Sequence, residues 1–107
     1  APNEEILKNL NEAIGRCPQL MQARVDRAHV LINLKQEKEA LPDLLLAQKA
    51  NPDEPSIHFL LASVYRAQGQ PEQAKQQLHL YGELQRAASA AVAERANEAI
   101  TLKNTAH

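Results

Sequence analysis

Apolar residues in the middle of the chain recur at three- and four-residue steps, and prolines and a glycine interrupt them. This spacing places them on one face of a helix that Pro55 can open and Gly69 can close. The first face consists of Ile57, Leu60, Leu61, Val64 and Tyr65. A second face follows Pro71 and consists of Ala74, Leu78 and Tyr81. The pattern therefore predicts two amphipathic helices joined by a short turn.

The same pattern returns at a regular interval, which carries residues 21–54 onto 55–88. These two segments match at six positions, and residues 3–20 match 37–54 at five more. Chance would give roughly four matches in so biased a composition. Nine of the eleven pairs are apolar residues or prolines. These are the residue types that helix packing and the turns between helices would require at equivalent positions. The clearest are Ala28/Ala62, Val30/Val64, Ala40/Ala74, Leu44/Leu78 and Pro18/Pro52.

Composition agrees with a small helical domain and excludes some partners. The 107 residues include eighteen alanines and only three glycines, which favours helix. The net charge is −1 and no basic cluster is present, so we expect no nucleic-acid binding. No apolar run is long enough to insert into a membrane, and no signal peptide opens the chain. The single cysteine excludes an internal disulfide and slightly favours a soluble, cytoplasmic location.

No arrangement of residues suggests an enzyme. The four histidines lack ligand spacing to one another or to carboxylates and cysteine, so we expect no metal and no cofactor. No Ser/His/Asp or Cys/His set is present, so we expect no catalytic residue. His58 is expected to be a half-buried packing residue, and Cys17 a small buried one. The histidines are His29, His58, His79 and His107.

The recurring helix–turn–helix period resembles the tetratricopeptide repeat. In the second copy, the family's positions are His58, Leu61, Ala62, Tyr65, Gly69, Ala74 and Leu78. In the first copy, they are Arg24, Arg27, Ala28, Leu31, Ala40, Leu44, Ala47 and Pro52. The resemblance implies an all-α solenoid of about two and a half repeats, with helix A and helix B of each repeat meeting at the small residues.

Five residues depart from the family's pattern. Arg24 and His58 replace an aromatic residue, Arg27 replaces leucine, and Arg86 stands where a third closing proline belongs. Pro42 falls inside helix B of the first copy, where it removes a backbone donor. We therefore expect that helix to start late or to bend.

We expect a single domain over residues 1–107. It begins with a helix B that lacks its helix A, which predicts that the chain is part of a longer protein. The segments are a half repeat at 3–18, full repeats at 21–54 and 55–88, and a C-terminal helix at 89–103.

The C-terminal helix has two possible arrangements. Residues 89–103 match residues 21–35 at six positions, which favours a third helix A that folds back as a cap. However, neither glycine nor proline lies between Glu83 and His107. The alternative is one helix from Pro71 to about Leu102, which would project an apolar stripe and invite dimerisation.

The resemblance implies that the A helices line a concave face that holds a peptide or a helix of a partner. The residues expected there are Gln22, Val25, Asp26, His29, Ile32, Asn33, Phe59, Leu60, Ser63 and Arg66. Val25, Ile32 and Phe59 are apolar and lie off the core face, so they suit an apolar anchor. The alternative for Phe59 is packing against a neighbouring helix. Glu94 and Asn97 would extend the row if the cap forms.

These observations predict a protein–protein interaction module whose concave groove binds a partner, with Phe59 as the main anchor. The alternative is a structural module that dimerises, or docks within a larger assembly, through its terminal helices.

Overall fold

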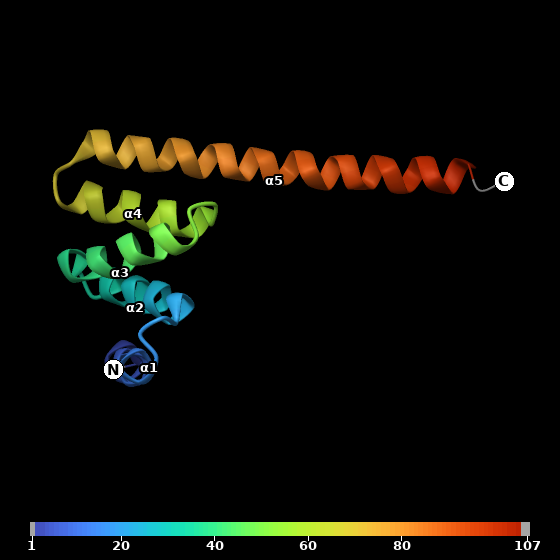
Figure 1. Cartoon of the computed structure of the whole chain (residues 1–107). Coiled ribbons are helices and arrows are strands. Elements are labelled where there is room, and N and C mark those ends of the chain that lie inside the picture. The colour runs from blue at the N-terminus through green and yellow to red at the C-terminus, as the bar shows by residue number, and fades with distance from the viewer. Residues whose placement is uncertain (1, 106–107) are drawn as a thin grey trace.

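The computed structural model describes residues 2–105, and these residues form five α-helices and no strand. The helices stack one above the next into a ladder, from which the last helix projects (Figure 1). The expected all-α, helix–turn–helix solenoid is confirmed. No helix in this range combines the length and the apolar character that a membrane span requires. The helices are α1 (Pro2–Arg16), α2 (Met21–Asn33), α3 (Glu37–Ala50), α4 (Pro55–Ala67) and α5 (Pro71–Thr105).

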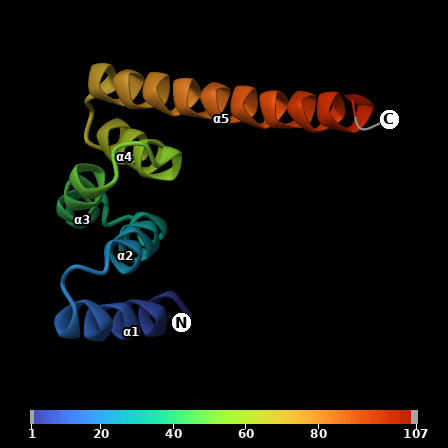
Figure 2. The same ribbon diagram turned by 45° about the vertical axis from the view of Figure 1, so that its right-hand side comes forward.

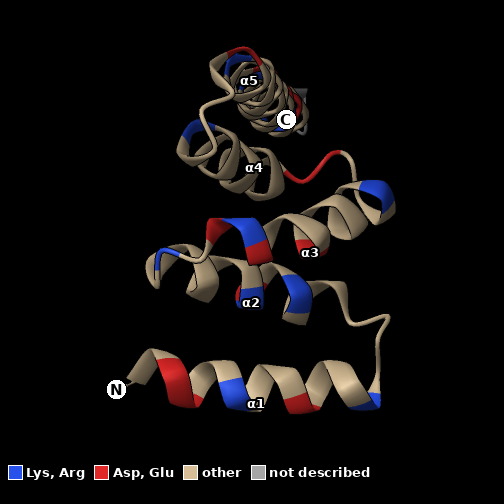
Figure 3. Cartoon of the chain, turned by 90° about the vertical axis from the view of Figure 1, so that its left-hand side faces the viewer, with Lys and Arg blue, Asp and Glu red and all other residues tan. Residues whose placement is uncertain are grey.

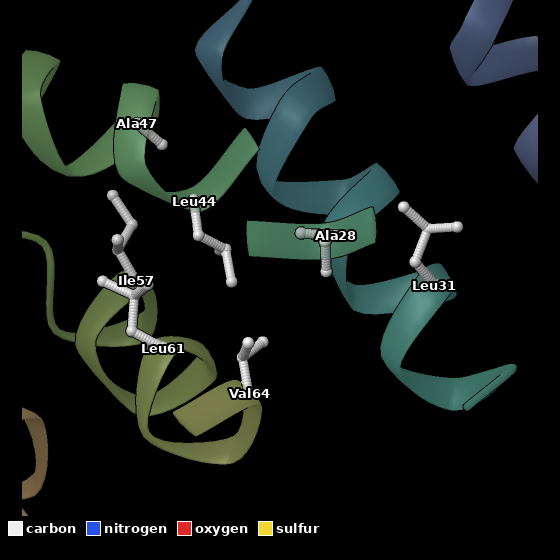
Figure 4. Packing of buried hydrophobic residues seen from close by; sticks show 8 residues of the cluster. Ala28, Leu31, Leu44, Ala47, Ile57, Leu61 and Val64 are labelled. Carbon is white, nitrogen blue, oxygen red and sulfur yellow. The ribbon is translucent and has the colours of Figure 1, made fainter. Parts of the chain in front are cut away.

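The core lies where α3 packs between α2 and α4 (Figure 4). Ala28 and Ala40 are fully buried, because small side chains let the helix backbones approach closely. Leu44, Leu61 and Val64 are the largest fully buried side chains, and each contributes roughly 1.5–3 kcal/mol by burial. The predicted core positions therefore hold the two full repeats together.

The turns within the two repeats have the same geometry. Lys35 and Gly69 occupy the same position of successive repeats, and both adopt a left-handed backbone with φ of 63° and 72°. In each turn the following amide donates to a carbonyl five residues earlier, Gln36 N to Leu31 O and Gln70 N to Tyr65 O, both at 2.8 Å. This bond satisfies a carbonyl at the end of each A helix. Gly69 adopts this conformation freely, whereas Lys35 does so with steric strain.

Pro42 does not delay its helix. α3 begins at Glu37, one period before α5 begins at Pro71, so the expected late start is wrong. Pro42 lies inside α3 with its ring exposed, and its nitrogen cannot donate to the Lys38 carbonyl. The helix tolerates this loss because burial on its other face holds it.

The prediction of a capping helix is also wrong. The structure has the alternative arrangement, in which one long helix begins at Pro71. α5 continues without a break to Thr105. Arg86 replaces the closing proline, so nothing interrupts the helix. Glu98 occupies the position of Val30 and Val64, which are buried in the two repeats. A fold-back cap would have to bury that carboxylate, and the extended helix leaves it in water.

The C-terminal half of α5 projects from the ladder (Figures 1 and 2). The helix has 35 residues, or about 52 Å at 1.5 Å per residue, and the molecule is 59 Å along its longest axis. Val92, Ile100 and Leu102 are more than half exposed on this projection. Glu94 and Asn97 also lie there, so they do not extend the row of A-helix residues.

Candidate functional site

The two arginines that depart from the family pattern share one buried carboxylate. Asp43 on α3 is only 2% exposed. Arg24 donates from Nη1 to Asp43 Oδ1 at 2.9 Å, and Arg27 donates from Nε and Nη2 to its two oxygens, both at 2.7 Å. Two charge-assisted pairs therefore join α2 to α3 where the family has apolar packing.

The hydrogen bond to Asp43 raises the pKa of Arg27, against the opposing effect of burial. A raised pKa means that folding favours the charged guanidinium. Arg27 thus stays charged from acid to strongly alkaline solution. The stability that this charge contributes is lost as the pH rises through that raised pKa.

His58 makes an equivalent link without a formal charge pair. Its side chain is 3% exposed, which is more buried than expected. Nε2 lies 2.6 Å from the carbonyl oxygen of Pro52 and must donate, because a carbonyl only accepts. Nδ1 lies 2.7 Å from the side-chain oxygen Oε1 of Gln77 on α5. His58 therefore joins α4 both to the preceding loop and to α5.

The two links occupy matching positions of the repeat. Arg24 and His58 lie one period apart, and so do Asp43 and Gln77. Arg24 Nε also donates to the carbonyl of Pro18 at 2.8 Å, one period before the contact of His58 with Pro52. The departures from the family pattern at Arg24 and His58 are thus compensated in pairs, and each link joins an A helix to the B helix of the same repeat.

A hollow of about 380 Å³ lies between the two A helices, α2 and α4. Gln22, Asp26 and His29 are exposed along it, and Val25 and Leu60 form its half-buried floor. Phe59 rises at its edge with 49% of its surface exposed. The lining residues are Gln22, Val25, Asp26, His29, Ser56, Phe59 and Leu60. Six of the ten expected partner-binding residues therefore line one hollow.

A second hollow of about 350 Å³ lies on the other side of Phe59, between α4 and α5. Phe59 packs against Tyr81 with ring centroids 5.4 Å apart and an interplanar angle of 50°. Gln85 donates to the Tyr81 hydroxyl at 3.1 Å. The lining residues are Glu54, Pro55, Ser56, Phe59, Tyr81 and Gln85. Both hollows include Ser56 and Phe59, so they adjoin at these two residues. The two hollows together are called the Phe59 groove below.

The other four expected residues do not line the Phe59 groove. Ile32 packs against the buried core. Ser63 donates back to the Phe59 carbonyl at 3.3 Å. Asn33 and Arg66 are exposed and line neither hollow. The expected row is thus divided between groove, core and open surface.

Sequence reasoning misses the α5 side of the groove. It places Tyr81 on a helix face but does not predict the contact with Phe59. A signal is present, because the two residues lie ten and twelve positions on either side of Gly69. In a helical hairpin such positions meet. Sequence reasoning also misses Glu54, whose carboxylate accepts from the Ser56 amide and caps α4.

Metal-binding chemistry is not evident in residues 2–105. These residues contain no group of three or more histidine, cysteine or acidic side chains able to hold a metal ion. Cys17 is half-buried rather than fully buried. His107 lies outside the described residues.

Stacked helix pairs with one recurring turn and a concave groove define a helical-repeat protein of the solenoid class. A family model, the tetratricopeptide repeat, matches residues 22–54 and 55–79, which together cover more than half of the chain. The chain therefore belongs to the tetratricopeptide repeat family, whose members generally mediate protein–protein interaction and typically act as non-catalytic scaffolds. No curated protein matches the chain.

Proposed function

We propose that this chain binds a peptide or a helix of a partner protein in the Phe59 groove, without catalysis of its own. The observation that carries the proposal is the position of Phe59 between two adjoining hollows, half exposed and held by Tyr81. An aromatic residue that is braced on one side and open on the other loses little conformational freedom on binding. Aromatic residues, phenylalanine among them, are enriched in protein–protein interfaces.

The frame around the groove supports this role. The links from Arg24 to Asp43 and from His58 to Gln77 fix α2 and α4, the two helices that form its first hollow. A groove whose walls do not move binds with less ordering cost than a mobile one. The rigid repeats thus present Phe59 in one position.

Affinity capture from a source-cell lysate tests the groove. We expect the wild-type chain to retain a protein that a Val25→Glu/Phe59→Glu variant loses. The matched control is Leu46→Glu/Leu80→Glu, which places two charges at exposed apolar positions of α3 and α5 outside the groove. Circular dichroism checks that both variants fold. Equal capture by the wild type and the groove variant would refute the proposal.

Assembly through α5 is the second candidate function. The observation in its favour is the projecting half of α5, where Val92, Ile100 and Leu102 are exposed. Light scattering coupled to size exclusion measures the mass in solution. A dimer that a Val92→Glu/Leu102→Glu variant converts to monomer would support assembly, and a wild-type monomer at micromolar concentration would refute self-association.

A further inference from the structure

Acidic residues, but no lysine or arginine of the described chain, line the Phe59 groove. Asp26 is the charged residue of its first hollow and Glu54 that of its second. Within residues 2–105, no lysine or arginine lines either hollow, and no ion pair engages either carboxylate. The connection between α3 and α4, which supplies Glu54, is acidic in Figure 3. The groove is therefore an apolar strip with negative charge on two sides.

Both carboxylates are held in place by neutral donors. Asp26 accepts from Gln22 Nε2 at 2.9 Å. Glu54 accepts from the Ser56 hydroxyl at 3.1 Å and from the Ser56 amide at 3.5 Å. These bonds orient the carboxylates and leave their charges uncompensated. Each has further lone pairs that can accept from a cation.

The aromatic residues favour the same ligand charge. The exposed face of Phe59, with Tyr81 beside it, presents the negative side of a ring quadrupole that attracts ammonium and guanidinium groups. Arg86, the nearest arginine along α5, lies back against Gly82 on its own helix. No cation of residues 2–105 stacks on either ring. A lysine or arginine of a ligand would find both the carboxylates and the rings available.

We infer that the Phe59 groove takes a basic segment of a partner protein, in which an apolar anchor is flanked by lysine or arginine. This inference rests on the proposed function and adds the chemical class of the ligand. The apolar anchor packs on Phe59, Val25 and Leu60. The flanking cations lie near Asp26 at one end and Glu54 at the other.

Selection from phage-displayed random peptides of twelve residues tests the ligand class without assuming a sequence. The bait is the full 107-residue chain, and peptides that also bind Phe59→Ala are removed. We expect the retained peptides to carry a large apolar residue with lysine or arginine on both sides. Acidic or neutral retained peptides would overturn the charge inference while leaving groove binding intact. Loss of every enriched peptide at the Phe59→Ala removal step would overturn both, and failure to enrich any peptide at all would overturn the inference.

One retained peptide then serves as the probe for affinity measurements by fluorescence anisotropy. We expect Asp26→Asn/Glu54→Gln to weaken binding by roughly tenfold in low salt, since each exposed pair is worth about two- to fivefold. Both substitutions keep the side-chain oxygen that accepts the local hydrogen bond. The matched control, Glu39→Gln/Glu72→Gln, changes the net charge equally but lies outside the groove. Equal weakening by both variants would overturn the inference, because it would show only a general charge effect.

Discussion

The two full repeats and the projecting half of α5 carry the same periodic pattern, yet only the repeats fold into the ladder. Residues 89–103 match residues 21–35 at six positions, including Arg95 with Arg27. In the repeats, the position of Glu98 holds Val30 or Val64, both buried. In the projection, that position holds a carboxylate that stays in water. A matching period is therefore not sufficient for packing.

The comparison also shows which departures a repeat can absorb. Arg27 occupies the position that Leu61 fills in the second repeat, and it is tolerated because Asp43 receives it across the helix pair. A polar residue at a packing position needs a partner on the facing helix. The fold-back of residues 89–103 would instead require burying Glu98, and extension of α5 avoids that cost.

The largest expected effect is on the overall shape of the chain. It comes from giving residues 86–98 the prolines and apolar residues that the full repeats have at equivalent positions. The variant Arg86→Pro/Ser89→Pro/Arg95→Leu/Glu98→Val restores the prolines between repeats and the apolar packing positions. We expect residues 89–103 to fold back as a cap, because the helix is interrupted and its new face can be buried. The Cα radius of gyration should fall from 18.1 Å toward about 13 Å, the value for a compact domain of this length. Small-angle X-ray scattering measures the change.

The control for this variant keeps the helix uninterrupted. Arg95→Leu/Glu98→Val without the prolines should remain extended, with scattering at low concentration like that of the wild type. If the variant with all four substitutions also remained extended, the identity of the packing positions would not explain why the third copy fails to pack.

Sequence predicted the repeat fold well because its determinants are local and periodic. Apolar steps, prolines and Gly69 define the helices, and the regular period places equivalent helices side by side. Hydrophobic burial at these positions depends little on the details of side-chain contacts. The end of the last helix was harder to predict, because the weak apolar pattern of residues 89–103 competes with an uninterrupted run of helix-forming residues.

The candidate site was only partly predictable. The groove residues on α2 and α4 follow from helix periodicity, since most of them lie off the core face, and only Val25 and Leu60 also pack against the core. The contribution of Tyr81 and the links to Asp43 and Gln77 depend on pairs of side chains that come from different helices. Single-sequence periodicity contains no information about such pairs, although the departures at Arg24 and His58 marked where they occur.

Asp43→Ala should have the largest effect on stability among single substitutions. It removes the acceptor of three hydrogen bonds and leaves Arg24 and Arg27 without a counter-charge at a half-buried site. We expect the free energy of unfolding to fall by about 3–5 kcal/mol. Urea denaturation followed by circular dichroism measures it, with the exposed Asp53→Ala as control. A loss below about 1 kcal/mol would show that the pair does not hold α2 to α3.

His58→Ala tests the matching link of the second repeat and should have a smaller effect. It removes two hydrogen bonds and some buried volume but leaves no uncompensated charge, so we expect a loss of about 2 kcal/mol. The exposed His29→Ala is the matched control, with an expected change within about 0.5 kcal/mol. A double-mutant cycle with Gln77→Ala separates the hydrogen bond from the packing. Additive losses would mean that the contact at 2.7 Å contributes nothing.

The smallest expected effect distinguishes the two A–B turns. Lys35 adopts a left-handed backbone that Gly69 adopts without strain, so Lys35→Gly should stabilise the chain by about 1 kcal/mol. The reciprocal Gly69→Lys should destabilise it by a similar amount. A Cβ at Gly69 meets nothing within 4 Å, so this loss reports backbone strain rather than a clash. Opposite shifts of the urea midpoint would show that the second repeat has the better turn, whereas a loss for Lys35→Gly would mean that the lysine side chain contributes more than its strained backbone costs.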